Sequence, residues 1–266
     1  MTQATNTVNN AQFSKLEQGK VACFFNQTLI NDFSEKMLSP SYWQQKDAVT
    51  GSAQGRGTTW FVAYSDINHI QHDWVLRHYY RGGLMGKINK DSYWFSGLEK
   101  TRAACEFALL RHMQTLQLPA PEPIAYRVIQ HALSYTADLL SSRIQHAQDL
   151  VAILSEKALA DDVWRRIGAT IKRFHHHGIY HHDLNSHNIL LNDKEQVFLI
   201  DFDRGELRTN PVNTSWKQEN MARLQRSFLK ELNKLEKFYF TEQNWQALMN
   251  GYQDANTPDV ERLKSS

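Results

Sequence analysis

The spacing of hydrophobic and polar positions changes character about halfway along the chain. In the first half, short runs of β-branched and aromatic residues alternate with turns that contain glycine or proline, which is typical of strands. These runs predict strands over residues 21–25, 73–80, 124–129 and 133–140, and a strand–turn–strand over residues 49–62. One helix interrupts them at residues 101–118, where apolar residues recur at helical spacing before three prolines.

The second half shows helical spacing instead. Residues 161–176 carry apolar side chains on one face, and Gly178 suits a left-handed helix end. Further helices are predicted over residues 216–235 and, more briefly, 245–252. Between the helices, apolar runs at 189–191 and 197–200 flank a polar turn, which predicts a hairpin.

These patterns favour an α+β protein that is rich in strands first and mainly helical afterwards. Residues 1–20 are polar for most of their length, and we expect them to be poorly ordered. Composition turns polar again around residues 141–146, which makes this segment a candidate hinge. The predicted organisation is therefore a β-rich part over 21–143 and a mainly helical part over 144–266, while residues 33–47 are expected to form packed irregular structure or a short helix.

Composition changes this picture little. Hydrophobic residues make up 41% of the chain and charged residues 22%, with a net charge of +2, so no general nucleic-acid binding is indicated. Cys23 and Cys105 lack metal-ligand spacing and are expected to be reduced. No apolar run approaches the roughly 18 residues that span a bilayer, and the N-terminus lacks a signal-peptide pattern. We therefore expect the protein to meet a membrane only from its surface, inside the cell.

The candidate chemistry lies in and after the predicted hairpin. Asp183 precedes Asn188 by five residues, and Asp201 follows the second apolar run. An Asp that accepts a hydroxyl proton, together with an Asn and an Asp that ligate a divalent cation, are the groups that phosphoryl transfer needs. The hairpin is expected to bring Asn188 and Asp201 to neighbouring strand ends. The pattern resembles the kinase motifs H-R-D-x-x-x-x-N and D-F-G, with His182 replacing Arg and Asp203 replacing Gly.

Asp203 has two interpretations, since it can join Asp201 as a metal ligand or form an ion pair with Arg204 or Arg208. The segment from Asp201 to the next predicted helix is too short for the activation segment and A-P-E element of protein kinases. The acceptor is therefore expected to be a small molecule, a sugar or a lipid headgroup rather than a peptide.

Six histidines between residues 175 and 187 also suggest a metal-hydrolase alternative, with ligands such as His181, His182, Asp183 and His187. Their spacing does not match H-E-x-x-H, and that reading leaves Asn188 without a role. We instead expect residues 175–177 to lie at a helix end as cations that interact with its dipole. His181 is expected to hold the loop by hydrogen bonds, and His187 to pack or bond beside it.

A glycine-rich turn and two charged residues are the candidates for nucleotide binding. Gly55, Arg56 and Gly57 lie between two predicted strands, where backbone N–H groups can approach phosphate oxygens, although a glycine hairpin without a ligand fits equally. Arg77 occupies the strand position of the kinase lysine, and Glu106 on the next helix is its candidate partner. The pair can also be purely structural, and Arg81 or Lys87 are alternative cations.

Together, several segments resemble the 3-deoxy-D-manno-octulosonic acid (Kdo) kinases, within the lipopolysaccharide core kinases of the protein-kinase-like superfamily. These segments are residues 55–62, 75–84, 101–110, 135–140, 183–191, 199–205 and 220–227. The resemblance implies a two-lobed fold with a β-rich N-lobe that contains one helix and a mainly helical C-lobe. It also implies Asp183 as the catalytic aspartate, Asn188 and Asp201 as metal ligands, and ATP with Mg²⁺ as cofactors.

The resemblance further implies that a Kdo hydroxyl, at the 4-position, is phosphorylated on Kdo-lipid IVA. That acceptor implies peripheral contact with the cytoplasmic face of a Gram-negative inner membrane, and no obligate protein partner is evident. The alternatives are a kinase for heptose or an aminoglycoside-like acceptor, and a pseudokinase that acts as a binding module. A membrane-docking surface is predicted at Arg81, Lys87, Lys90, Tyr93, Trp94 and Phe95. The alternatives to it are that Tyr93, Trp94 and Phe95 are core residues and that docking uses the helix with Arg223, Arg226 and Lys230.

Overall fold

The computed structural model describes residues 12–55, 57–80, 91–210 and 214–254. The chain divides into two compact units. The first unit comprises Met1–Phe107 and Glu122–Arg143, and the second comprises Ala108–Pro121 and Ile144–Ser266. The division after Arg143 falls in the polar segment 141–146, whereas residues 108–121 group with the second unit although they precede that segment.

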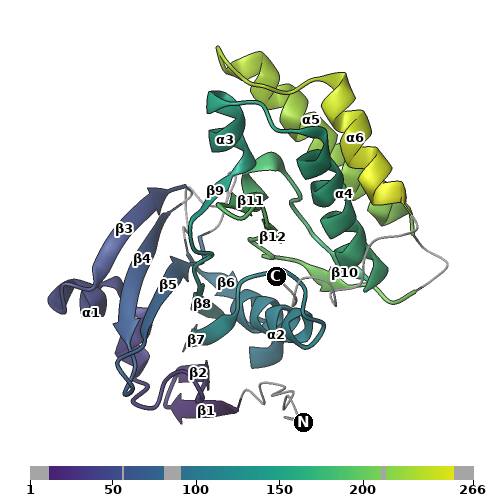
Figure 1. The fold of residues 1–266 in the computed structure, drawn as a ribbon. Coiled ribbons are helices and arrows are strands. Elements are labelled where there is room, and N and C mark those ends of the chain that lie inside the picture. Colours follow the sequence, from purple (N-terminus) through teal and green to yellow (C-terminus); the bar gives the residue numbers. More distant parts are fainter. Residues whose placement is uncertain (1–11, 56, 81–90, 211–213, 255–266) are drawn as a thin grey trace, which may run out of the picture. The chain divides into compact units, whose positions relative to one another are not determined.

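The first unit contains an eight-stranded sheet whose described pairs are all antiparallel. Its order is β1-β2-β7-β8-β5-β4-β3, and β6 pairs with β8 at the side (Figure 1). The strands are β1 (Phe13–Gln18), β2 (Val21–Asn26), β3 (Val49–Gln54), β4 (Thr58–Ser65), β5 (Gln71–His78), β6 (Tyr93–Trp94), β7 (Pro123–His131) and β8 (Ser134–Ser142).

Alternation along the strands gives this sheet two packed faces, because successive side chains point to opposite sides. On one face, Phe24 and Tyr126 lie with ring centroids 5.6 and 5.2 Å from Phe107 of helix α2 (Arg102–Thr115). The other face packs against Trp43, which comes from α1 (Pro40–Gln45) and follows the 3-10 helix η1 (Glu35–Leu38). A second short 3-10 helix, η3 (Leu98–Lys100), precedes α2.

The second unit is mainly helical. Its helices are α3 (Leu150–Glu156), α4 (Asp161–His176), α5 (Ser215–Lys234) and α6 (Glu242–Gln253). Two small antiparallel sheets accompany them, β12-β11-β9 and β10-β13. Their strands are β9 (Ala147–Asp149), β10 (Ile179–Tyr180), β11 (Ile189–Asn192), β12 (Val197–Leu199) and β13 (Glu206–Leu207).

Helices α4 and α6 lie side by side in Figure 1, and two glycines allow their close contact. A Cβ atom at Gly168 would lie 1.9 Å from the carbonyl oxygen of Leu248, and one at Gly251 would lie 2.0 Å from that of Arg165. Any larger residue at either position would therefore push the two helices apart. This contact fixes the position of α6 against the N-terminal half of α4, the helix that leads into β10 and the candidate catalytic loop.

The mixed α and β composition confirms the predicted class, and each helix and strand expected from the sequence is present. The expectation of poor order before residue 20 is wrong for Phe13–Gln18, which forms β1, while residues 1–11 lie outside the described residues. The strand forms because it pairs with β2, and the ring of Phe13 stacks on Phe24 with centroids 5.8 Å apart. Among the described residues, no helix combines the length and apolar character needed to cross a bilayer.

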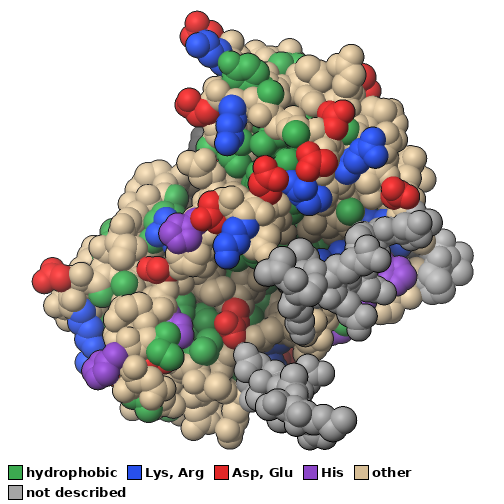
Figure 2. Space-filling view, in the orientation of Figure 1, with side chains coloured by type: hydrophobic (Ala, Val, Ile, Leu, Met, Phe, Trp, Pro, Cys, Tyr) green, Lys and Arg blue, Asp and Glu red, His purple; other side chains and the backbone are tan. Residues whose placement is uncertain are grey.

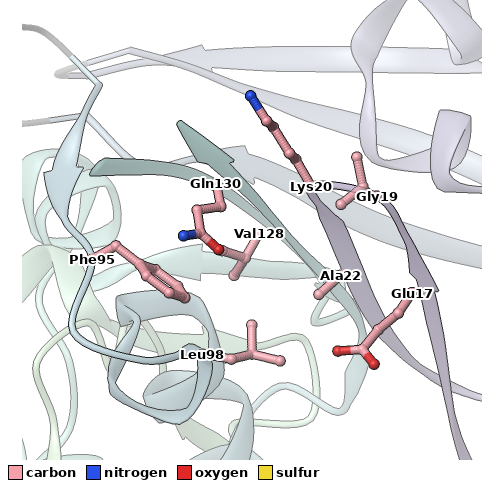
Figure 3. Close-up of a pocket in the computed structure, with 9 residues that line it drawn as sticks. Glu17, Gly19, Lys20, Ala22, Phe95, Leu98, Val128 and Gln130 are labelled. Atoms are coloured by element: carbon pink, nitrogen blue, oxygen red, sulfur yellow. The ribbon is translucent and has the colours of Figure 1, made fainter. Parts of the chain in front are cut away.

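The surface gives no single charged region on the side that Figure 2 shows, where acidic and basic side chains are interspersed. The first unit contains a cavity of ≈ 280 Å³ (Figure 3), and none of its lining residues belongs to the predicted catalytic, nucleotide-binding or metal site. The cavity is lined by Glu17, Gly19, Lys20, Val21, Ala22, Phe95, Leu98, Val128 and Gln130.

Candidate functional site

The loop between β10 and β11 holds Asp183 and Asn188, and its own hydrogen bonds fix its shape. The side-chain amide of Asn188 donates to the carbonyl oxygen of Asp183 over 2.9 Å. This bond uses Nδ2, and the amide oxygen of Asn188 has no hydrogen-bond partner among the described residues. The side chain of Asn188 is 9% exposed, whereas Asp183 is exposed. An amide oxygen without a hydrogen-bond partner among the described residues and a solvent-accessible carboxylate therefore come from one short loop.

His181 connects this loop to the strand that precedes Asp201. Its Nδ1 accepts from the backbone N–H of Asp183 over 3.2 Å, and its Nε2 donates to the carbonyl oxygen of Ile200 over 2.9 Å. These two roles require the neutral tautomer with the proton on Nε2. Burial lowers the pKa of His181, which agrees with that neutral state. The prediction that His181 holds the loop by hydrogen bonds is confirmed.

The hairpin of β11 and β12 brings Asn188 and Asp201 to neighbouring strand ends, as predicted. Ile189 pairs with Leu199, and the backbone N–H of Ile200 donates to the carbonyl oxygen of Asn188 over 3.0 Å. Asp201 follows immediately and has a φ of 60°, in the left-handed region that residues other than glycine seldom adopt. Such a conformation persists only where neighbours enforce it, and it is common at functional sites.

Phe202, the next residue, is anchored in the core of the second unit. Its side chain is fully buried, stacks on Phe174 of α4 with centroids 5.7 Å apart, and lies 4.8 Å from the ring of His181. Asp201 is thus exposed between a strand end and a buried ring, and Asp203 follows in the same turn, partly buried. Arg208, one of the two arginines expected to pair with Asp203, binds Glu206 over 2.8 Å.

The donor set suits a hard cation. Among the described residues, no three histidine, cysteine, aspartate or glutamate side chains gather as a metal site, so the histidine-based hydrolase alternative finds no support. The amide oxygen of Asn188 and the carboxylate of Asp201 are the oxygen ligands that Mg²⁺ prefers, and Asp203 offers another. The residues present therefore fit magnesium better than zinc.

Two residues of α5 support the loop, and the sequence did not single out their role. The side chain of Asn220 is buried; its Nδ2 donates to the carbonyl oxygen of His181 over 3.0 Å, and its Oδ1 accepts from the backbone N–H of His181 over 3.3 Å. Ser227 accepts from the backbone N–H of Ser186 over 2.7 Å. The sequence did contain a signal for this role, because Asn220 and Ser227 are polar residues on the otherwise apolar face of a predicted helix.

His175 corrects a prediction about the histidines at the end of α4. It is 3% exposed, and its ring contacts the hydroxyl of Tyr252 (2.7 Å from Nδ1) and Oδ1 of Asn220 (3.3 Å from Nε2). Burial lowers the pKa of His175 to about 3, so the ring is neutral and cannot act as a cation at the helix end. His187 lies beside the loop as expected, with Nδ1 3.4 Å from a carboxylate oxygen of Asp149.

The first unit holds the candidates for nucleotide binding. Nη2 of Arg77 lies 2.6 and 2.5 Å from the two carboxylate oxygens of Glu106, so the predicted ion pair forms. The hydroxyl of Tyr79 also donates to Glu106, over 2.7 Å, and Glu106 is 3% exposed. A carboxylate this deeply buried requires such partners. The alternative cations Arg81 and Lys87 lie outside the described residues.

The glycine turn between β3 and β4 is tight. The N–H of Gly55 donates to the carbonyl oxygen of Gly57 over 3.0 Å, while Arg56 lies outside the described residues. A Cβ atom at Gly57 would lie 2.0 Å from the ring of Tyr80. Any larger residue at position 57 would therefore have to displace the ring of Tyr80.

The predicted docking surface is only partly described, because Arg81, Lys87 and Lys90 lie outside the described residues. Of the rest, Tyr93 is 9% exposed and belongs to the core, as the alternative interpretation expected. Trp94 is 65% exposed, and its side chain is available at the surface. The core interpretation is thus confirmed for Tyr93, and docking through Trp94 stays a prediction.

A loop that bears an aspartate, a hairpin with an oxygen-bearing side chain at each strand end, and a sheet with an Arg–Glu pair are together typical of protein-kinase-like phosphotransferases. The chain belongs to the lipopolysaccharide kinase (Kdo/WaaP) family, whose family model matches residues 40–252. This membership confirms the resemblance that the sequence motifs indicated, and it makes the protein an enzyme of the kinase class.

Three relatives show how far the similarity extends. Each bears the name 3-deoxy-D-manno-octulosonic acid kinase. The protein of Vibrio cholerae is 47% identical over 211 residues, 79% of this chain and 86% of the relative. That of Mannheimia succiniciproducens is 48% identical over 225 residues (83% and 91%), and that of Haemophilus influenzae is 42% identical over 243 residues (90% and 98%). The similarity thus covers most of both chains in each comparison.

Proposed function

We propose that this protein is an ATP-dependent kinase that phosphorylates the 4-hydroxyl of Kdo in Kdo-lipid IVA, a step of lipopolysaccharide inner-core biosynthesis. The names of the relatives and the family membership support a Kdo-containing acceptor. The observation that carries the proposal is the bond from Asn188 to the Asp183 carbonyl, together with the bond from Ile200 to Asn188. We infer that the two units correspond to the N-lobe and C-lobe of a protein-kinase-like fold.

Asp183 is the catalytic residue of this proposal. Its exposed carboxylate orients the acceptor hydroxyl and accepts its proton, while the hydroxyl oxygen attacks the γ-phosphoryl group of ATP and ADP leaves with the oxygen that bridged the β- and γ-phosphates. The hydrogen bonds from Asn188 and to His181 engage its backbone only, so they hold the residue in place and leave the carboxylate to the substrate.

Asn188, Asp201 and Asp203 would hold Mg²⁺, which when bound neutralises charge on the ATP phosphates. Their contribution is a fixed set of oxygen atoms, because the hairpin register and the buried Phe202 set the backbone on both sides of Asp201. A preformed ligand set reduces the reorganisation that accompanies metal binding.

Gly55, Arg56, Gly57, Arg77 and Glu106 form the proposed phosphate-binding part. Arg77 carries a charge at all physiological pH values and can bind two phosphate oxygens at once, as lysine cannot. In the described residues Glu106 holds the guanidinium of Arg77, as the helix glutamate holds the strand lysine of protein kinases.

The location follows from the acceptor. Kdo-lipid IVA carries acyl chains that stay in a bilayer, so the enzyme must work at a membrane surface, which we place at the cytoplasmic face of the Gram-negative inner membrane. The exposed side chain of Trp94 is suited to the interface between headgroups and acyl chains.

Incubation of the purified protein with ATP, Mg²⁺ and detergent-dispersed Kdo-lipid IVA tests the proposal, with the product analysed by mass spectrometry and NMR. We expect one added phosphate at the 4-position, and Asp183→Asn should reduce the rate by about 10²- to 10⁴-fold. Transfer to heptose or an aminoglycoside in place of Kdo would reassign the acceptor. A protein that binds ATP but transfers phosphate to none of them would be a pseudokinase.

A further inference from the structure

Three basic side chains from separate segments of the second unit gather beside Asp183. The first is His182, the neighbour of Asp183 in the loop. The second is Arg204, which lies two residues before Glu206, the partner of Tyr180 in the antiparallel β10-β13 ladder, and which is one of the charges that act on the His182 ring.

The third is Arg223, which helix α5 brings to the same loop. Asn220 contacts the loop at His181, and Ser227 contacts it at Ser186. Residues 220, 223 or 224, and 227 share one face of a helix, because the helix repeats every 3.6 residues. Arg223 lies between the two contact points and therefore faces the part of the loop that contains His182 and Asp183.

The two arginines lack partners that would account for their charge. Neither the guanidinium of Arg204 nor that of Arg223 makes an ion pair or hydrogen bond with any residue that the structure describes. Nε of Arg223 is shut off from solvent and is also unsatisfied. Burying a polar N–H without a partner is unfavourable, so such a group commonly signals a ligand.

The charges that act on His182 show that this corner is positive. Burial lowers the pKa of His182, and Arg204 and Arg223 lower it further, whereas Asp183 and Glu206 act in the opposite direction. Glu206 is already paired with Arg208 over 2.8 Å. The acidic groups that face His182 are thus the catalytic carboxylate and a carboxylate engaged elsewhere.

We propose that Arg204 and Arg223 bind the carboxylate of the acceptor sugar acid and so hold its hydroxyl at Asp183. This inference rests on the proposed function. Arginine binds carboxylates in a two-pronged geometry that lysine cannot reproduce. The carboxylate is attached to the same sugar that carries the reacting hydroxyl, so an anion site next to Asp183 is within its reach. The phosphates of the lipid anchor belong to other sugars.

The test compares acceptor kinetics for the acid and for its carboxamide, using detergent-dispersed Kdo-lipid IVA in both forms. For the wild type, KM should be about 10- to 100-fold lower for the acid than for the amide. Arg223→Ala and Arg204→Ala should raise KM for the acid toward that of the amide and leave KM for ATP unchanged. Arg223→Lys should recover part of the difference.

Lys237→Ala is the matched control, since Lys237 is exposed just after α5 and should keep both constants. Thermal denaturation of each variant verifies folding. Equal preference for acid over amide in the wild type and both alanine variants would overturn the proposal. So would a wild-type KM that depends on the lipid phosphates and not on the carboxylate.

A second measurement is independent of turnover. Calorimetric titration with the free sugar acid should give tighter binding than with its amide, and Arg223→Ala should abolish the difference. If the wild type transfers no phosphate to any Kdo acceptor, the proposed function fails, but this titration still decides whether the arginines bind the carboxylate.

Discussion

The two units prepare charged groups in opposite ways. In the first unit, Glu106 is buried and depends on Arg77 and Tyr79 for its hydrogen bonds. In the second, Asp183 and Asp201 are exposed, and neutral groups such as Asn220 and His181 hold the backbone around them. Function and stability are therefore coupled in the first unit, because removing one partner leaves a buried charge. For Asp183 and Asp201 in the second unit, function and stability are separable.

The largest effect should come from Asp201→Ala. Loss of the carboxylate that we assign to Mg²⁺ should abolish turnover and weaken metal-dependent nucleotide binding. The melting temperature should stay close to that of the wild type, because the Asp201 side chain is exposed and relief of the positive φ is not expected from alanine. Phosphate transfer, nucleotide titration with and without Mg²⁺, and thermal denaturation measure the three quantities. Wild-type turnover in this variant would remove Asp201 from the metal site.

Arg77 should give a smaller loss of activity and a larger loss of stability. Arg77→Ala leaves Glu106 buried without its cation, and we expect a loss of roughly 3 kcal/mol in the free energy of unfolding. Arg77→Lys should keep a measurable fraction of activity, because the charge survives while the two-pronged contact is lost. Denaturant unfolding and initial rates provide the measurements.

The control for Arg77 is the double variant Arg77→Ala/Glu106→Gln, which removes the stranded charge and should recover part of the lost stability. Full activity in Arg77→Ala would show that another cation binds the phosphates. Full stability would show that the coupling described for the first unit is absent.

The sequence predicted the parts of this fold that local patterns determine. The apolar face over residues 161–176 matches α4, because the spacing of apolar residues is enough to predict a long amphipathic helix. Strand β1 was missed because its sequence is polar and its order comes from pairing with β2. Helix α3 was missed because seven residues carry too little periodicity.

The same distinction applies to the site. Asn188 and Asp201 lie at neighbouring strand ends because β11 and β12 form a hairpin, and the sequence alone was enough to predict that hairpin. The hydrogen bonds to the His181 backbone come from Asn220, which lies 39 residues away along the chain, and no local sequence pattern predicts such a contact. His175 was taken for a helix-end cation because burial, which decides its charge, depends on the packing of α5 and α6.

Asn220 offers a way to test whether neutral support positions the loop. Asn220→Ala removes both hydrogen bonds to the His181 backbone and should cost about 1–3 kcal/mol of stability. We expect kcat to fall while KM for ATP stays unchanged, because the loop that carries Asp183 loses its support. Asn220→Asp should restore the bond from the His181 N–H only, with intermediate kcat. A loss of stability with unaltered kcat would make Asn220 structural only.

The smallest effect concerns pH and follows from the neutral state of His175. Its pKa is about 3 in the folded protein, against about 6.5 when unfolded, so below pH 6.5 the unfolded chain binds a proton that the folded protein does not. The stability from this residue is present above pH 6.5 and is lost as pH falls toward 3, by about 1.4 kcal/mol per pH unit.

Denaturant unfolding of the wild type and of His175→Gln from pH 7.5 to 5 isolates the contribution of His175, since His181 is unchanged in both. The variant should be less stable at pH 7.5, because its packing against Tyr252 and Trp216 is altered, but its stability should fall less steeply with acid. Parallel curves would mean that His175 accepts its proton in the folded state, and the second unit would then depend on a buried charge as the first unit does.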